Sequence, residues 1–391
     1  MLTMDQQFVA RHPGTGVIMS PRICSRKQIE RHAVELRQQN ARVLFDPQFY
    51  QPRTERENII AYPYWDDMDF ATTDFATNGA TELCEGVVRY QVTVLQVDAV
   101  ILPGRYTNAL TDEWLAMQHK LAETAYGLNV DRPVYSTLAI GPDIVSEQQI
   151  FDQVLNEVVG YPVDGVYVVL KAPNGDFLTT SELYMYNLLD GFLSLALNGK
   201  KIILGYANQQ SLIYAGAGVT GLATGNYRNV RSFDPEMFDV KETTDIATRA
   251  VWYYDANTLS DFRPETLGLA YSRGLAGNFG PPCSYCSSLL SASNPAVVPW
   301  KEPDAFRHYL TEMHRQWSSF SDTPTAKRVT LATNLVKSAG SKLDFLRISA
   351  CPKRKRAAGL IHPVELATLL LYHLRPRSVQ GQSGAVRCQK G

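Results

Sequence analysis

The sequence has few cysteines, no long hydrophobic run and almost no net charge, and each shortage excludes a class of protein. Six cysteines in 391 residues are too few for a small disulfide scaffold and suit a reducing compartment. No apolar stretch approaches the roughly 18 residues needed to span a bilayer, so we expect no membrane partner. Residues 1–7 lack the basic-then-apolar pattern of a signal peptide. We therefore expect a cytoplasmic protein.

Several common catalytic motifs are also missing. The sequence contains no phosphate-binding P-loop, no nucleophile-elbow serine and no H-E-x-x-H pattern. The segment 216–221 formally matches G-x-G-x-x-G, but it precedes an expected strand instead of joining a strand to a helix, so we interpret it as a turn. A composition of 45% hydrophobic and 20% charged residues indicates a folded chain with a large core.

The small net charge of −1 hides two unlike regions. From Lys327 to Gly391 there are 13 basic and 2 acidic residues, whereas the preceding 326 residues carry 25 basic and 37 acidic residues. This switch predicts a boundary near residue 322. We therefore expect an N-terminal segment and helix over 1–40, a main domain over 41–322 and a basic, poorly ordered tail over 323–391.

The basic tail contains a dense cationic cluster at 353–356. Such a cluster is typical of an arm that contacts nucleic-acid phosphates, of a nuclear-localisation sequence, or of a solvated terminus. The segment 363–374 is predicted to form one apolar helix with a proline in its first turn.

Short apolar runs alternate with amphipathic segments through most of the chain. Strands are expected at 42–46, 98–103, 133–140, 165–170, 202–205 and 219–224, with 250–255 and 267–271 as two further candidates. Helices of 12–18 residues between continuous apolar strands indicate a parallel sheet that is buried on both faces. Eight such units predict an α/β fold of the (β/α)8 TIM-barrel type, and an open doubly wound parallel sheet is the alternative.

Both architectures bind ligands at the carboxyl ends of the strands. The residues that follow the expected strands are rich in amides, aromatic rings and cationic groups. Amides and aromatic faces suit a planar heterocycle, and arginine suits a phosphate or carboxylate. The predicted substrate-binding residues are Arg105, Tyr106, Lys171, Tyr206, Asn208, Gln209, Asn226, Arg228 and Arg231.

Two aspartates are candidates for catalysis because each closes an expected strand. Asp46 and Asp255 could act as a nucleophile or as a general acid/base. Asp46 precedes a proline, so it could instead shape a turn.

Cys283 and Cys286 form a C-x-x-C pair, a spacing at which two thiolates can chelate one Zn²⁺. The expected helix over 304–317 carries His308 and His314, which point about 120° apart on a helix, so we expect only one to bind. The segment 281–317 is therefore a predicted zinc-binding segment within the main domain, with Cys24 or Cys84 as guesses for a further ligand. A redox pair and two ordinary buried thiols are the alternatives.

A predicted barrel followed by C-x-x-C and a histidine-bearing helix resembles the tRNA-guanine transglycosylase superfamily in layout. The resemblance implies a (β/α)8 barrel, a late zinc site and exchange of a purine base through an aspartate nucleophile, here Asp255. The family's additional cysteine, two residues before the pair, is replaced by Pro281.

Two functions follow as hypotheses. In the first, the chain is a nucleobase- or nucleoside-directed enzyme that exchanges bases in a transglycosylase-like reaction. In the second, it is a non-catalytic barrel module that binds a nucleotide, a nucleic acid or a protein partner within an assembly.

Overall fold

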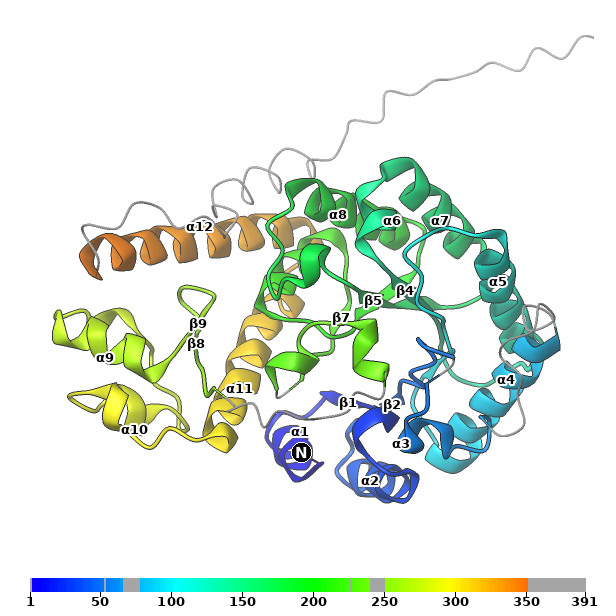
Figure 1. Ribbon diagram of the computed structural model, residues 1–391, viewed down its shortest axis with the longest axis horizontal. Helices are drawn as coiled ribbons and strands as arrows, with labels where there is room; N and C mark the ends of the chain where they lie inside the picture. The colour runs from blue at the N-terminus through cyan, green and yellow to red at the C-terminus, as the bar shows by residue number, and fades with distance from the viewer. Residues whose placement is uncertain (1, 53, 66–77, 226, 240–249, 351–391) are drawn as a thin grey trace, which may run out of the picture.

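The computed structural model describes residues 2–52, 54–65, 78–225, 227–239 and 250–350. Within them lie seven parallel strands in chain order and a smaller lobe that follows the strands (Figure 1). The parallel strands are β1 (Gly16–Met19), β2 (Arg42–Phe45), β3 (Val100–Ile101), β4 (Val134–Ile140), β5 (Gly165–Leu170), β6 (Lys201–Leu204) and β7 (Gly221–Leu222).

The strands form one five-stranded sheet, β3–β4–β5–β6–β7, and one pair, β1–β2. Two hydrogen bonds connect the pair to the larger sheet: Asp98 N donates to Val43 O at 2.8 Å, and Val43 N donates to Asp98 Oδ2 at 2.7 Å. All residues of β4 are buried, as expected for a strand covered on both faces. The predicted α/β class and parallel sheet are therefore confirmed.

Helices lie outside the strands and form an arc around them in Figure 1. Capping groups set where several begin: Gln28 Oε1 accepts from Ser25 N before α2, and Thr111 Oγ1 accepts from Trp114 N in α5. The helices of this region are α1 (Leu2–Arg11), α2 (Arg26–Gln38), α3 (Glu57–Ile60), α4 (Asn78–Arg89), α5 (Asp112–Gly127), α6 (Pro142–Ser146), α7 (Gln148–Gly160) and α8 (Glu182–Leu197), with short helical turns η1 (Pro21–Ile23), η3 (Tyr90–Leu95), η4 (Pro173–Gly175), η5 (Gln209–Ala217), η6 (Arg228–Val230) and η7 (Pro235–Phe238).

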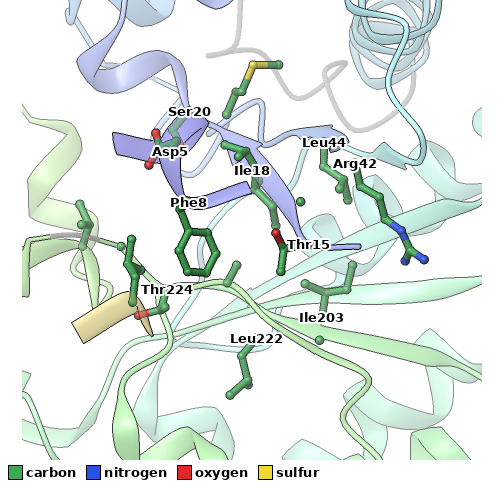
Figure 2. Close-up of a pocket in the computed structure, with 18 of the residues that line it drawn as sticks. Asp5, Phe8, Thr15, Ile18, Ser20, Arg42, Leu44, Ile203, Leu222 and Thr224 are labelled. Carbon is green, nitrogen blue, oxygen red and sulfur yellow. The ribbon is translucent and has the colours of Figure 1, made fainter. Parts of the chain in front are cut away.

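The eight-stranded barrel is not formed by the described residues. No strand pairing joins β7 to β1 in this part of the chain, and a cavity of about 620 Å³ lies between them (Figure 2). The sheet is therefore open and parallel, but its strands follow one another in chain order, so the doubly wound order of the alternative prediction is not found among the described strands.

The two remaining predicted strands do not extend the parallel sheet. The first, β8 (Tyr253–Asp255), pairs with β9 (Ser260–Phe262) in an antiparallel hairpin. The second lies within a helix, α9 (Pro264–Ser272), because Pro264 and Glu265 occupy its first turn and the short apolar run also fits a helical face.

The lobe contains this hairpin, α9, η8 (Ala276–Asn278), α10 (Ser287–Leu290) and η9 (Pro295–Val297). The long helix α11 (Glu302–Ser321) contacts β8 on one side and α1 and η5 on the other, so it joins the lobe to the sheet. The start of the predicted tail is ordered as a helix, α12 (Thr325–Ala350), which packs on η5 and α9. The basic cluster at 353–356 and the predicted helix at 363–374 lie outside the described residues.

Candidate functional site: a metal centre and a buried carboxylate

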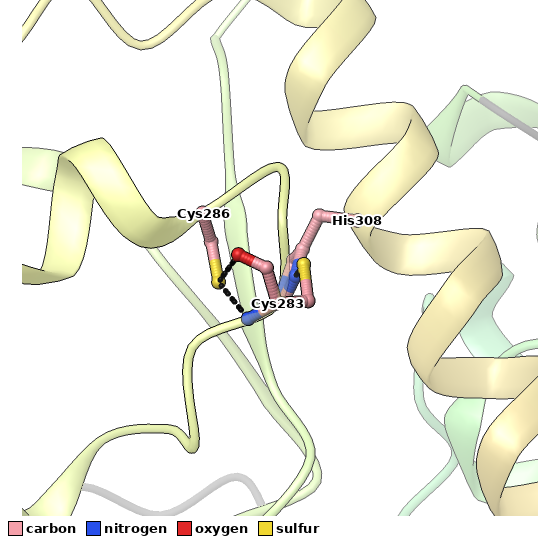
Figure 3. A group of neighbouring side chains, drawn as sticks. All are labelled: Cys283, Cys286 and His308. Atoms are coloured by element: carbon pink, nitrogen blue, oxygen red, sulfur yellow. Dashed lines mark hydrogen bonds between the residues drawn. The ribbon is translucent and has the colours of Figure 1, made fainter.

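Cys283, Cys286 and His308 lie together in the lobe (Figure 3). Their ligand atoms all lie within 4.8 Å of one another, and Cys283 Sγ is 3.2 Å from His308 Nδ1. In a tetrahedral zinc site, two sulfurs lie about 3.8 Å apart and sulfur and nitrogen about 3.6 Å apart, given the usual bond lengths. The three donors therefore fit a single ion.

The chain holds the two cysteines through a tight turn before α10. The amide of Cys283 donates to Cys286 Sγ at 3.1 Å, and the amide of Tyr285 donates to Cys283 Sγ at 3.4 Å. Amides that point at sulfur stabilise thiolates, which are the form that binds a metal. The predicted pair is thus arranged for ligation.

His308 is fixed by the β8 hairpin. Its Nε2 lies 2.6 Å from the carbonyl oxygen of Tyr254, and its ring stacks on Tyr253 at 4.9 Å. A carbonyl oxygen only accepts, so Nε2 carries the proton and donates, and Nδ1 keeps its lone pair toward Cys283. Metal-binding histidines commonly donate their second nitrogen to a carbonyl in this way.

The two thiols have opposed ionisation. Hydrogen bonding to Cys286, followed by interaction with His308, lowers the pKa of Cys283 to about 4. The same sulfur pair, together with burial, raises the pKa of Cys286. A bound cation would remove this conflict because it stabilises both thiolates.

The other predicted ligands lie elsewhere. His314 contacts Phe8 of α1 and His12, which follows α1, with 4.2 Å between the two imidazole centres. Cys24 lines the cavity beside β1, and Cys84 Sγ contacts the carbonyl oxygen of Leu121. The structure thus brings His308, and not His314, to the two cysteines, and it places Cys24 and Cys84 away from them.

Asp46 follows β2 and is almost fully buried, with 1% of its surface exposed. Its Oδ1 accepts from the amide of Gln48 at 2.9 Å, and its Oδ2 accepts from Tyr50 at 2.8 Å and from Tyr167 at 3.3 Å. Gln48 Nε2 in turn donates to the Tyr206 hydroxyl at 2.8 Å. This carboxylate cluster joins the carboxyl end of β2 to β5 and to the residues after β6.

Burial raises the pKa of Asp46 to about 6, and the hydrogen bonds from Tyr50, Gln48 and Tyr167 oppose the rise. A carboxylate with this pKa can exchange a proton near neutral pH. Gln48 and Tyr206 also adopt left-handed backbone conformations, with φ of 56° and 52°, which costs free energy in residues other than glycine. Gln48, Tyr167 and Tyr206 line the cavity between β1 and β7.

Most of the other predicted binding residues already have partners within the protein. Arg105 pairs with Glu113 at 3.2 Å, and Lys171 pairs with Asp234 at 3.4 Å. These contacts hold the loops that follow the strands.

Two predicted amides and Arg231 have structural contacts as well. Asn208 caps η5 by accepting from the amide of Gln210 at 2.9 Å. Gln209 and Arg231 are buried and both face Asp261, at 3.5 Å and 3.9 Å. Asn226 lies outside the described residues.

Arg228 has a different environment. It is exposed, and its guanidinium lies 4.3 Å from the ring centre of Phe177 and 4.7 Å from that of Trp252. Arg263 lies over the same Trp252 ring at 5.1 Å. Aromatic and cationic groups therefore alternate from the loop after β5, across the loop after β7, to the lobe. We call these four residues, Phe177, Arg228, Trp252 and Arg263, the stacked rim.

Asp255 lies apart from the Asp46 cluster, in the β8–β9 hairpin. Its Oδ2 accepts from the hydroxyl of Thr258 at 2.8 Å and from the main-chain amide of the same threonine at 3.1 Å. Its Oδ1 accepts from the main-chain amide of Gly280 at 3.4 Å. The prediction that it closes a strand of the parallel sheet is wrong, because its strand belongs to the hairpin. These bonds hold the hairpin against the segment that leads to Cys283.

We expect Asp255→Ala to destabilise the lobe by about 1–3 kcal/mol, because it leaves buried donors of Thr258 and Gly280 without an acceptor. Urea unfolding followed by fluorescence would measure the change. Asp255→Asn, which keeps an acceptor oxygen, is the matched control and should lose less. Equal stability of the alanine variant and the wild type would contradict this role.

Gln48 and Tyr50 belong to a segment that follows an expected strand, but neither they nor Tyr167 were among the predicted binding residues. Gln48 and Tyr50 follow Asp46 directly, so their proximity was visible, but their hydrogen bonds depend on a left-handed turn. Tyr167 lies within the apolar run of β5, and its hydroxyl was the only signal. Phe177 and Trp252 were likewise inconspicuous, because they are far apart in the chain.

Comparison with models of known protein families gives no match, and comparison with curated proteins gives none either. None of the helices in the described ranges is both long enough and apolar enough to cross a membrane.

Proposed function

We propose that the chain is a nucleobase- or nucleoside-directed enzyme in which Asp46 acts as the general base. The observation that carries this proposal is the buried Asp46 cluster: a carboxyl with a pKa of about 6, held by two tyrosines and one amide at the carboxyl ends of the strands. Ligands of parallel α/β sheets bind at this edge. The cavity-lining Tyr167 connects Asp46 to the place where a substrate would lie.

The proposed proton transfer uses Tyr167 as a relay. A substrate N–H gives its proton to the Tyr167 oxygen while the Tyr167 proton moves to Asp46 Oδ2. The heterocycle keeps the electron pair of the broken N–H bond and becomes the better nucleophile. This is the step that an incoming base requires in a transglycosylase-like exchange, where it displaces an enzyme carboxylate from the anomeric carbon of the sugar.

The identity of that sugar-attacking carboxylate is a separate part of the proposal. Asp255 is the candidate that the sequence suggested, but its hydrogen bonds to Thr258 and Gly280 favour a structural role. Base exchange would be tested by incubating the protein with mixed nucleosides and free bases and analysing the products by mass spectrometry. A new nucleoside supports the proposal, and its absence in every mixture argues for a binding module.

The metal centre supports the proposal indirectly. Two cysteines and one histidine are typical ligands of zinc, which would stabilise the lobe that carries Trp252 and Arg263. In this proposal zinc has a structural role, and the fourth ligand is supplied from outside the three-residue group.

A second candidate function, binding of single-stranded nucleic acid without catalysis, is favoured by the stacked rim. Alternating aromatic and guanidinium groups can stack bases and contact phosphates at the same time. The rim lies next to strand-end loops on one side and to the lobe on the other, so one strand could contact both.

We expect a single-stranded oligonucleotide to quench the fluorescence of Trp252, and Arg228→Gln to weaken binding. Loss of one stacking contact costs about 1–3 kcal/mol, or roughly 5- to 150-fold in affinity. Arg105→Gln is the matched control, because Arg105 is partly exposed but already paired with Glu113. Equal weakening by both variants would indicate only a general charge effect and would contradict a specific role of the rim.

A further inference from the structure

The cavity between β1 and β7 lies between two unpaired sheet edges. In the described part of the chain, β1 pairs only with β2, β7 pairs only with β6, and no main-chain hydrogen bond joins β1 to β7. Figure 2 shows the cavity with Ile18 of β1 on one side and Ile203 and Leu222 on the other. The place of one further strand is therefore open.

The hydrogen-bond pattern identifies the main-chain groups that face this gap. The carbonyl of Thr15 accepts from the amide of Arg42, and the carbonyl of Met19 accepts from the amide of Asp46. The main-chain carbonyls of Thr15 and Met19 therefore point toward β2. Alternate residues of a parallel strand bond to opposite sides, which turns the amide and carbonyl of Ile18 toward the gap. On β7, the amide of Ala223 donates to Leu204 of β6, which turns the amide and carbonyl of Leu222 toward the gap in the same way.

An extended peptide matches this gap better than an alkyl chain does. Buried main-chain groups without partners are costly, and an alkyl chain would leave those of both edges unpaired. A peptide strand can bond to β1 on one side and to β7 on the other, as in known cases of strand addition. Phe8, Leu44 and Leu222 along the walls would contact its apolar side chains.

One charged group sets the direction and the end of such a peptide. Arg22 follows β1 and lines the cavity, and its buried Nε has no hydrogen-bond partner. Its main-chain amide is fixed by Gln48 Oε1 at 2.8 Å. A peptide parallel to the seven strands would bring its carboxyl end to the same edge of the sheet as Arg22.

We propose that the cavity between β1 and β7 binds an extended peptide as an added parallel strand, with the peptide's C-terminal carboxylate at Arg22. The bound segment should be short, because β1 itself has only four residues. The peptide would occupy the same cavity as the substrate of the proposed reaction and would compete with it, but its binding does not require Asp46 to be catalytic.

The test compares two random hexapeptide libraries that differ only in having a free or an amidated C-terminus. The full chain is incubated with each library, and retained peptides are identified by mass spectrometry after ultrafiltration. We expect retention of the free-acid peptides, with amidated versions of the same sequences binding about tenfold more weakly, because a charge-assisted bond to Arg22 is lost.

Variants of two arginines that line the cavity locate the carboxylate. Arg22→Gln should abolish the preference for the free acid, whereas Arg42→Gln, at the amino end of β2, should leave it unchanged. Equal binding of acid and amide to the wild type, or an unchanged preference in Arg22→Gln, would overturn the assignment of the carboxylate.

Hydrogen–deuterium exchange tests the strand addition independently. The amides of Ile18 and Leu222 should exchange quickly in the free protein and become protected when a retained peptide is added. Slow exchange of both amides in the free protein would mean that the edges are already paired. No retention from either library would also overturn the proposal.

Discussion

Purified protein is expected to contain one zinc ion per chain, and the Cys286→Ser variant is expected to contain none. Cys286 is fully buried and lies within reach of Cys283 and His308, so serine at this position removes a thiolate that no neighbour replaces. Apparent binding free energies of structural zinc are about 10–16 kcal/mol at neutral pH, which makes this the largest effect expected for the lobe. Elemental analysis of freshly reduced protein would measure it.

Loss of the metal should also unfold the lobe. Among the described residues, the buried members of its separate hydrophobic cluster are, apart from the cysteine, Tyr253, Leu267, Leu289, Trp300 and Ala305. A core this small rarely supports a fold without a metal or a disulfide. We expect a chelator to expose the lobe to proteolysis while the sheet domain stays intact.

Two histidines on α11 provide the matched comparison for this experiment. His308→Gln should lose the metal, whereas His314→Gln, which alters the contact with Phe8 and His12, should keep it. A metal-free wild type, or equal metal content in both variants, would leave the pair as ordinary thiols and remove the structural role of zinc.

The second large effect is expected at Asp46, where stability and activity should change in opposite directions. The folded pKa of about 6 lies above the ordinary value of 3.8, so the folded protein holds its proton more tightly than the unfolded chain. The contribution of this carboxyl to the free energy of unfolding is fully present below about pH 4 and is lost as the pH rises to about 6. Above that pH the free energy of unfolding is lower by about 3 kcal/mol.

Asp46→Asn removes this charge and keeps a similar shape, so we expect it to be more stable than the wild type at pH 8, by up to about 3 kcal/mol. The difference should be smaller at pH 5, where part of the wild-type carboxyl is already protonated. Urea unfolding at the two pH values would measure both numbers. The stability of Asp46→Asn relative to the wild type should be higher at pH 8 than at pH 5. The opposite order would contradict the raised pKa.

The same substitution should lower base-exchange turnover by about 10²- to 10⁴-fold, the usual contribution of a general base. Tyr167→Phe, which removes the proposed relay but leaves the carboxyl in place, should also lose turnover and should not gain stability. Full turnover in Asp46→Asn would exclude Asp46 as the base. Stability and activity thus separate a catalytic carboxylate from one that only shapes the turn before Pro47.

The sequence alone predicted much of the local structure of the sheet domain, although β1 was not among the expected strands. Continuous apolar runs such as 165–170 predicted buried parallel strands, because that signal lies within a few residues. The C-x-x-C spacing likewise predicted the cysteine half of the candidate metal site, since two thiolates three positions apart can reach one ion.

Tertiary structure decided what depends on contacts distant in the chain. Periodicity cannot distinguish a strand of the sheet from β8 of a hairpin, or from the short apolar face of α9, and it carries no information on whether β7 pairs with β1. Only packing of α11 between the lobe and α1 turns His308 toward the cysteines and His314 toward His12. Asp46 acquires its raised pKa for the same reason, because the surrounding core removes water from a carboxyl that the sequence places in an ordinary turn.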